Sequence, residues 1–200
     1  MGIDKYGTGD DPYCFPDSNV LRNVLNIEND TELEEAEELL TELAASQIEF
    51  KPPPYDLEYL KGIHQQLFVD LYEWAGELRT IDISKGATCF CSCNRIAPEA
   101  DKKFRELKNA DYYDNHDRSN LVTAVAEFYV ELNMVHPFRE GNGRAQRILF
   151  EHIIISCGFE FDLEGITQPE WVHANVAGVN CDYAPMAKLF ARCIGNRFVE

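Results

Sequence analysis

Positive charge is scarce in this sequence of 200 residues. It has 18 Lys and Arg residues against 35 Asp and Glu residues, which gives a formal net charge of −17 at pH 7. Such a surface repels nucleic-acid backbones and anionic headgroups, so indiscriminate nucleic-acid binders and binders of anionic membranes are excluded. We expect neither a direct nucleic-acid partner nor a membrane partner.

Long apolar runs are also missing. No stretch approaches the roughly 20 apolar residues that a membrane-spanning helix needs, and residues 1–10 lack the apolar segment of a signal peptide. The seven cysteines are odd in number, which excludes a complete disulfide framework. We therefore expect a cytoplasmic protein whose cysteines stay reduced.

The apolar residues that are present can fill one core. A hydrophobic share of 45% suits a single domain over residues 1–200. Capping boxes are predicted at Thr31–Glu34 and Thr167–Glu170. Between about 78 and 96 helical spacing gives way to alternation, which predicts a β-hairpin. Helical spacing predicts helices at about 31–47, 57–74, 121–135 and 143–154, from 167 onward, and at 185–194.

The most specific segment is residues 136–147, His-Pro-Phe-Arg-Glu-Gly-Asn-Gly-Arg-Ala-Gln-Arg. Gly141 and Gly143 flank Asn142, and these residue types tolerate the positive φ angles that turn successive N–H groups into one anion-binding nest. The following helix is expected to begin near Gly143 and to point its positive dipole end at the same anion. The segment thus predicts a phosphate-binding loop.

Charged side chains strengthen this prediction. Arg144 and Arg147 lie three residues apart on one helix face, where their guanidinium groups suit the outer phosphates of a nucleotide. The window that begins at Arg139 holds three arginines against one glutamate, so it is locally positive in an acidic chain. Glu140 would repel a phosphate unless a divalent cation lay between them, and Mg²⁺ favours that arrangement.

His136 is the candidate general base of the segment. It ends a predicted helix and is followed by Pro137, so its imidazole is expected at the mouth of the loop with a pKa near neutral. There it would deprotonate an incoming hydroxyl group. Phe138, between two functional residues, is expected to anchor the loop in the core.

These residues carry a resemblance to a known family. Residues 136–147 fill each fixed position of the signature H-P-F-x-D/E-G-N-G-R-x-x-R of the Fic (filamentation induced by cAMP) family. Residues 74–79, Trp-Ala-Gly-Glu-Leu-Arg, and the Lys-Gly-x-Thr-x-Phe stretch at 85–90 also look like Fic sequences. The resemblance implies a mainly α, Fic-like helical bundle with a small β-hairpin flap over the active site. It also implies a protein adenylyltransferase, which transfers AMP from ATP to a side-chain hydroxyl of a target protein with Mg²⁺ as cofactor.

The resemblance assigns roles residue by residue. His136 is implied to be the catalytic base and Glu140 the Mg²⁺ ligand. The implied nucleotide-binding residues are Lys85, Gly86, Gly141, Asn142, Gly143, Arg144 and Arg147. The flap, at about 78–96, is implied to hold an extended target segment by strand addition. Its target-docking residues would be Thr88, Cys89, Phe90, Asn94, Arg95 and Ile96.

Regulation is suggested by a missing motif. Many Fic proteins carry an inhibitory helix with the pattern S/T-x-x-x-E-G/N, and this sequence has no match to it. The resemblance therefore implies a bacterial toxin whose separate small antitoxin supplies the inhibitory glutamate near Arg147. Targets of such toxins include the type II topoisomerases DNA gyrase and topoisomerase IV.

Three alternatives stay open at the level of sequence. The chain is either an enzyme or a nucleotide- or peptide-binding module with the Fic fold and no turnover. An enzyme of this kind could also use another nucleotide or phosphoryl donor. Cys89, Cys91 and Cys93 would share one face of a strand, where they fit either a zinc or redox site or small apolar side chains on a half-buried strand.

Overall fold

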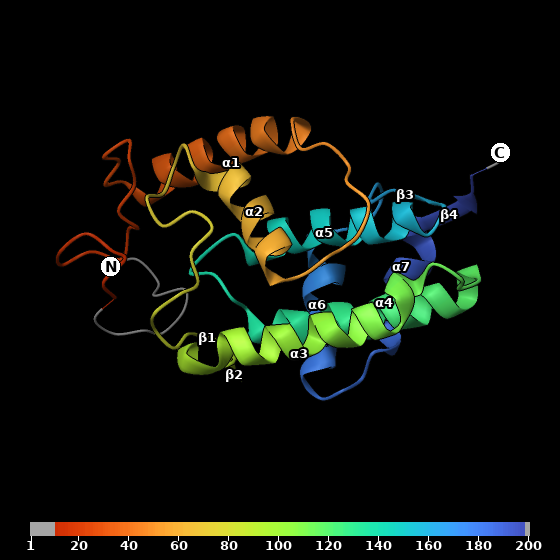
Figure 1. Ribbon diagram of the computed structural model, residues 1–200. Coiled ribbons are helices and arrows are strands. Elements are labelled where there is room, and N and C mark those ends of the chain that lie inside the picture. The colour runs from red at the N-terminus through yellow and green to blue at the C-terminus, as the bar shows by residue number, and fades with distance from the viewer. Residues whose placement is uncertain (1–10, 199–200) are drawn as a thin grey trace.

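The computed structural model describes residues 11–198, which form α-helices and two short pairs of antiparallel strands (Figure 1). The expected lack of a signal peptide concerns residues 1–10, outside the described residues. The helices are α1 (Asp30–Ser46), α2 (Leu57–Phe68), α3 (Ile96–Asn109), α4 (Arg118–Val135), α5 (Asn142–Ser156), α6 (Gln168–Val179) and α7 (Ala184–Cys193). The strands are β1 (Ser84–Lys85), β2 (Thr88–Cys89), β3 (Phe159–Phe161) and β4 (Ile194–Arg197), and single 3-10 turns are η1 (Cys93–Arg95) and η2 (Asp111–Tyr113).

Helices α4 and α5 form the centre of the bundle. Helix α4 packs against α3, α5, α6 and α7, whereas α5 packs against α2 and α4, and α1 covers α2. In Figure 1, α1 and α2 lie on one side of α5, and α3 and α4 lie on the other. The predicted fold class, mainly α with a small hairpin, is confirmed. None of the described helices combines the length and the apolar character needed to span a bilayer.

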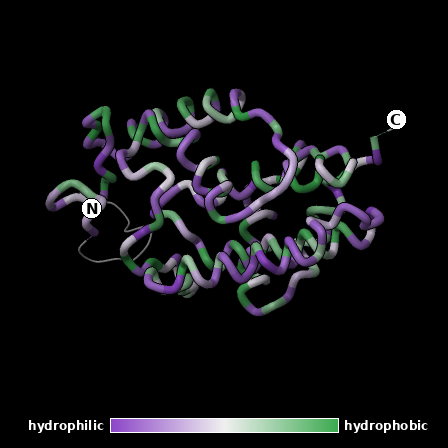
Figure 2. Tube along the Cα trace, in the orientation of Figure 1, coloured by the Kyte–Doolittle hydropathy of each residue, from purple (hydrophilic) through white to green (hydrophobic). Residues whose placement is uncertain are grey.

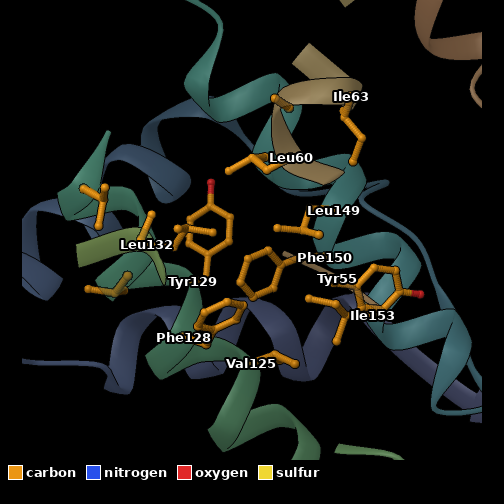
Figure 3. Packing of buried hydrophobic residues seen from close by; sticks show 14 of the residues in the cluster. Tyr55, Leu60, Ile63, Val125, Phe128, Tyr129, Leu132, Leu149, Phe150 and Ile153 are labelled. Carbon is orange, nitrogen blue, oxygen red and sulfur yellow. The ribbon is translucent and has the colours of Figure 1, made fainter. Parts of the chain in front are cut away.

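Aromatic side chains of α4 and α5 hold these two helices together. The ring of Phe150 is fully buried and its centroid lies 5.2 Å from that of Phe128 and 5.0 Å from that of Tyr129. Figure 3 shows labelled side chains from α2, α4 and α5 pointing toward one another around this ring. Hydrophobic and hydrophilic residues alternate along the helices (Figure 2), as expected when one face lies in the core. This packing fixes the end of α4 and the start of α5, and hence the loop between them.

Two helix ends differ from the sequence-based expectation. Helix α1 is capped by Asn29, whose side chain accepts the N–H of Glu32, so the predicted capping box at Thr31 is wrong. Helix α2 ends at Phe68, although apolar spacing continues to Trp74. The chain turns there, and the rings of Tyr72 and Trp74 stack with centroids 4.4 Å apart. The cap at Thr167, with both bonds of a capping box, is confirmed.

The flap is shorter than predicted. Its paired part is confined to β1 and β2, with Ser84 opposite Cys89 and Lys85 opposite Thr88. The pairing stops because the N–H of Cys91 donates to the carbonyl of Met134 in α4, at 3.0 Å, and so leaves the hairpin. The chain then enters η1 and α3. Helix α3 was not predicted, because its apolar residues are few and lie in a highly charged segment. The pair β3–β4 was also not predicted.

Candidate active site

The loop between α4 and α5 has two residues in the left-handed region. His136 is the C-cap of α4 with φ 47°, and Gly141 is the N-cap of α5 with φ 78°. Asn142 and Gly143 lie in the first turn of α5, so the predicted positive φ at Gly143 is wrong. The anion-binding feature of the loop is therefore a helix N-terminus, where the first N–H groups have no partner within the helix.

Gly141 also makes a close approach that a side chain would prevent. A Cβ atom built on it would lie 2.2 Å from Cε2 of Phe68 in α2. Glycine is thus required here both for its φ angle and for its lack of a side chain. The loop therefore packs directly against α2.

The side chain of Asn142 closes the loop on itself. Its Oδ1 accepts the N–H of Phe138 at 2.8 Å and its Nδ2 donates to the carbonyl of Phe138 at 2.7 Å. Phe138 is fully buried, as predicted for an anchor of the loop. The amide of Asn142 is therefore engaged inside the loop, which leaves its backbone N–H as the group that can face a phosphate.

A buried histidine of α2, which sequence reasoning missed, supports the loop between α4 and α5. Nδ1 of His64 accepts the N–H of Gly76 at 2.9 Å, so the proton lies on Nε2, which donates to the carbonyl of Glu140 at 2.9 Å. The ring stacks on Phe138 with centroids 3.8 Å apart. A histidine within the apolar stripe of α2 was the signal that could have found it.

His136 has the geometry of a general base. Its Nδ1 lies 3.1 Å from the carbonyl of Asn133, and because a carbonyl can only accept, Nδ1 carries the proton and Nε2 the lone pair. Its ring stacks on Phe90 of the flap with centroids 3.8 Å apart. Burial lowers the pKa of His136 to about 4, and the positive charges of Arg79 and Lys85 act in the same direction, so the predicted pKa near neutral is wrong. The imidazole is therefore neutral and able to accept a proton at physiological pH.

These groups face one cavity of about 500 Å³. The flap contributes Lys85, Gly86, Thr88 and Phe90, and the loop and α5 contribute His136, Glu140, Gly141, Asn142, Gly143, Arg144 and Arg147. Helix α4 adds Tyr129 and Asn133, and helix α6 forms the remaining wall, with Gln168, Trp171, Val172, Asn175, Val176 and Val179. Sequence reasoning missed this wall, although exposed valines on one face of a helix were a signal for it.

The other predicted flap residues lie away from the cavity. Cys89 is exposed and faces a separate hollow beside α3 and α4. Arg95 pairs with Glu99 at 2.5 Å. Ile96 is fully buried in the core, so its predicted role in target docking is wrong. Asn94 is exposed in η1, outside the cavity wall.

The three arginines of the segment have different surroundings. Arg139 is buried in an ion pair with Asp11 at 2.6 Å, so it does not add to the positive charge of the cavity, contrary to our expectation. Arg144 is paired with Glu37 of α1, which also accepts the hydroxyl of Tyr72. Arg147 lines the cavity and forms no salt bridge with a carboxylate of residues 11–198.

Glu37 is one of many acidic residues on α1, a composition typical of a solvated outer face. Instead its side chain is mostly buried, with 14% exposure, because it reaches Arg144 across 107 residues of sequence. The guanidinium of Arg144 also donates to the hydroxyl of Thr41 at 3.3 Å and lies over the ring of Phe68. Arg144 is therefore held in place before any ligand binds.

Glu140 is the carboxylate that the lining of the cavity offers to a divalent cation. Its Oε1 accepts the N–H of Gly141 at 3.0 Å. Among the described residues there is no group of three His, Cys, Asp or Glu side chains that could hold a metal by themselves. Mg²⁺ is commonly held by one or two carboxylates together with phosphate oxygens and water. Glu140 is the residue that would supply the carboxylate.

The three alternating cysteines do not share a strand face. Cys89 ends β2 and Cys93 begins η1, with Cys91 in the connection between them. All seven cysteines are free, and no metal-binding group of side chains includes these three in the described part of the chain. The predicted common face is wrong, and the structure gives no support for a zinc site there.

We expect the free energy of unfolding to fall as the pH drops from about 6.5 toward 4. Burial lowers the pKa of both His64 and His136 from 6.5 to about 4, so in this window the unfolded chain binds more protons than the folded chain. Each histidine then favours unfolding by at most about 1.4 kcal/mol per pH unit. Urea unfolding of the wild type and of His64→Gln across this range measures the effect, and equal slopes for the two proteins would contradict it.

Known proteins resemble this chain over nearly its whole length. A family model described as "Fic/DOC family" matches residues 54–154. "Probable protein adenylyltransferase Fic" of Escherichia coli (strain K12) is 37% identical over 191 residues, with 96% of each chain covered. "Protein adenylyltransferase VbhT" of Bartonella schoenbuchensis is 32% identical over 177 residues, which cover 86% of this chain and 36% of that protein. The crystal structure of the N-terminal Fic domain of a Bep effector from Bartonella quintana, with bound ADP, has a TM-score of 0.86 and 27% identity, and covers 92% of this chain and 95% of that one.

Proposed function

This chain belongs to the Fic/DOC family, and we propose that it is a protein adenylyltransferase that transfers AMP from ATP to a hydroxyl group of a target protein. The observation that carries the proposal is the convergence of four features on one cavity: a neutral histidine, a helix N-terminus, a carboxylate and an arginine without a salt bridge to the described residues. Relatives that match most of this chain are named protein adenylyltransferases. A similar Fic domain holds ADP, which supports a nucleotide as the occupant.

Each group has a defined part in the proposed reaction. The hydroxyl oxygen of the target attacks the α-phosphorus of ATP while Nε2 of His136 accepts the hydroxyl proton. The bond from the α-phosphorus to the bridging oxygen breaks, and pyrophosphate leaves. Mg²⁺ held by Glu140 would supply positive charge beside the phosphate oxygens. The rest of the catalysis is positioning and electrostatic stabilisation by fixed groups.

The phosphates are assigned to the start of α5. Its unpaired N–H groups, at Asn142 and Gly143, suit an anion at the helix N-terminus. Arg147 has a guanidinium without a salt bridge to the described residues and is assigned to the outer phosphates, together with Arg144 on its fixed support. Lys85 and Gly86 close the cavity from the flap side.

The target protein is proposed to bind along the flap. Thr88 and Phe90 line the cavity beside His136, so a segment added to the flap would bring a hydroxyl to the base.

We further propose that the chain is a bacterial toxin, that a type II topoisomerase is its target, and that a separate antitoxin places a glutamate near Arg147. The absence of an S/T-x-x-x-E-G/N motif supports the last point. We also propose that the chain acts in the cytoplasm, where its seven free cysteines would stay reduced.

Labelled ATP tests the activity. We expect that incubation with Mg²⁺ and bacterial lysate transfers label from α-labelled ATP, and none from γ-labelled ATP, to a lysate protein. Mass spectrometry of the labelled band identifies the target and the modified hydroxyl. Label from γ-labelled ATP would contradict AMP transfer and favour a phosphoryl donor, and stronger transfer from another nucleotide in parallel reactions would overturn ATP as the donor.

The same assay tests the assignment of Glu140. Replacing it by glutamine removes the negative charge and nearly preserves the shape. We therefore expect the Mg²⁺ concentration that gives half-maximal transfer to rise by an order of magnitude or more. Glu160 lies outside the cavity, so the control Glu160→Gln should leave this concentration unchanged. An unchanged Mg²⁺ requirement in Glu140→Gln would contradict the assignment of Glu140 as the Mg²⁺ ligand.

A further inference from the structure

Arg79 is a buried cation without a role in the chemistry described so far. Its residue is 2% exposed, and it forms no salt bridge with a carboxylate of residues 11–198. It does not line the nucleotide cavity either. Burial of an uncompensated charge is costly unless its donors are hydrogen-bonded. The bonds that Arg79 makes are therefore informative.

The guanidinium of Arg79 donates to four backbone carbonyls. Nε donates to the carbonyl of His136 at 2.8 Å, and Nη2 to that of Val135 at 3.4 Å. Nη1 donates to the carbonyl of Ile81 at 2.6 Å, and Nη2 also to that of Cys91. The backbone N–H of Arg79 donates to Pro137 at 2.9 Å. All three nitrogens of the guanidinium thus donate to main-chain acceptors.

These acceptors belong to two different parts of the site. Val135 and His136 end α4, where carbonyls have no partner within the helix and the dipole is negative. Ile81 precedes β1 and Cys91 follows β2, so they bracket the flap on both sides. Arg79 is therefore a direct link between the base and the flap.

The link acts at a backbone that needs support. His136 has φ 47°, a conformation that residues other than glycine rarely adopt. Its ring must also stay stacked on Phe90, which comes from the flap. Both conditions depend on holding the end of α4 and the two ends of the flap at fixed separation. The four bonds of Arg79 do this.

We propose that Arg79 is a positioning residue that fixes the catalytic base and the target-binding flap relative to each other, so that a hydroxyl docked on the flap meets Nε2 of His136. The inference rests on the proposed function. Its charge also favours the neutral form of the imidazole, since it lowers the pKa of His136. Arg79 makes no contact with the nucleotide cavity, so its effect should fall on the transfer step and on target binding.

Arg79→Lys tests this role with the charge retained. A lysine ammonium cannot span four carbonyls as the planar guanidinium does. We expect kcat for transfer to the target to fall on the order of 10²-fold, as for a misplaced catalytic group, while the KM for ATP stays within about twofold. Arg118→Lys is the matched control, because Arg118 also donates to backbone carbonyls, those of Ala191, Ile194 and Gly195, far along the chain from the site. Its kcat should be unchanged.

A double-mutant cycle separates positioning from a general loss of structure. If Arg79 acts by holding the flap against the base, the effect of Arg79→Lys on kcat should largely disappear in a Phe90→Ala background, where the stacked pair is already lost. Additive effects, or a fall in kcat that merely follows the folded fraction measured by circular dichroism, would overturn the proposal.

A readout without turnover distinguishes this inference from the activity itself. The ring of Phe90 shifts the NMR resonance of the His136 Cε1 proton through its ring current. We expect that shift to be lost in Arg79→Lys and kept in Arg118→Lys. A shift that persists in Arg79→Lys refutes the positioning role even if no target is found. If the shift is lost in Arg79→Lys and the wild-type protein shows no AMP transfer, the link stands and the proposed function is refuted.

Discussion

We expect replacement of His136 by alanine to lower the rate of AMP transfer by at least about 10²-fold and to leave ATP binding nearly unchanged. A positioned general base contributes about 10²–10⁴-fold to the rate, and Nε2 of His136 is the basic atom beside the flap. The phosphates are assigned to the start of α5 and to the arginines, which the substitution does not touch. Transfer is measured with α-labelled ATP, and ATP affinity by calorimetry with Mg²⁺ present.

The control for this substitution is His173→Ala. His173 is exposed on α6 and does not line the cavity, so its loss should change neither quantity. The result also discriminates enzyme from binding module. If wild type and His136→Ala had equal effects on the partner protein, a Fic-fold module that binds without turnover would be favoured.

We expect replacement of Gly141 by alanine to destabilise the fold and to remove activity together. The new Cβ would lie 2.2 Å from Phe68 in a residue with φ 78°. Backbone strain at positive φ costs about 1–3 kcal/mol and overpacking typically about 1–3 kcal/mol more. We expect a loss of about 2–6 kcal/mol in the free energy of unfolding, which is measured by urea denaturation.

Gly62→Ala offers a matched comparison in the helix that Gly141 contacts. Gly62 lies within α2 and a Cβ there would meet nothing within 4 Å. The same chemical change should therefore stabilise the protein by about 0.5–1 kcal/mol, because alanine is the better helix former. If the two variants had equal stability, the close approach of the loop to α2 would be refuted.

The parts of the site that are contiguous in sequence could be predicted. Residues 136–147 place a base, a carboxylate and a helix start within twelve positions, and local backbone rules suffice to interpret them. The pairing of Glu37 with Arg144 could not be predicted, because it depends on how α1 packs over α2. Before folding, Glu37 is one acid among many on a helix.

The length of the flap was predicted wrongly. Alternation of residue types continued beyond β2 and suggested a longer hairpin, but the N–H of Cys91 bonds to Met134 instead of to the opposite strand. Ile96 was assigned to target docking and proves to be a core residue of α3. Strand length is decided by which acceptor lies nearest in the folded chain, and periodicity alone does not contain that information.

The stack of Phe90 on His136 bears on how sparingly the protein uses ATP. One face of the imidazole is covered by an aromatic ring, and the histidine residue is only 9% exposed, so water approaches the base through the cavity. A water molecule activated there would cleave ATP to AMP and pyrophosphate without modifying anything. A target segment docked on the flap, as proposed, would fill this approach, disfavour futile hydrolysis and reserve the nucleotide for the acceptor hydroxyl.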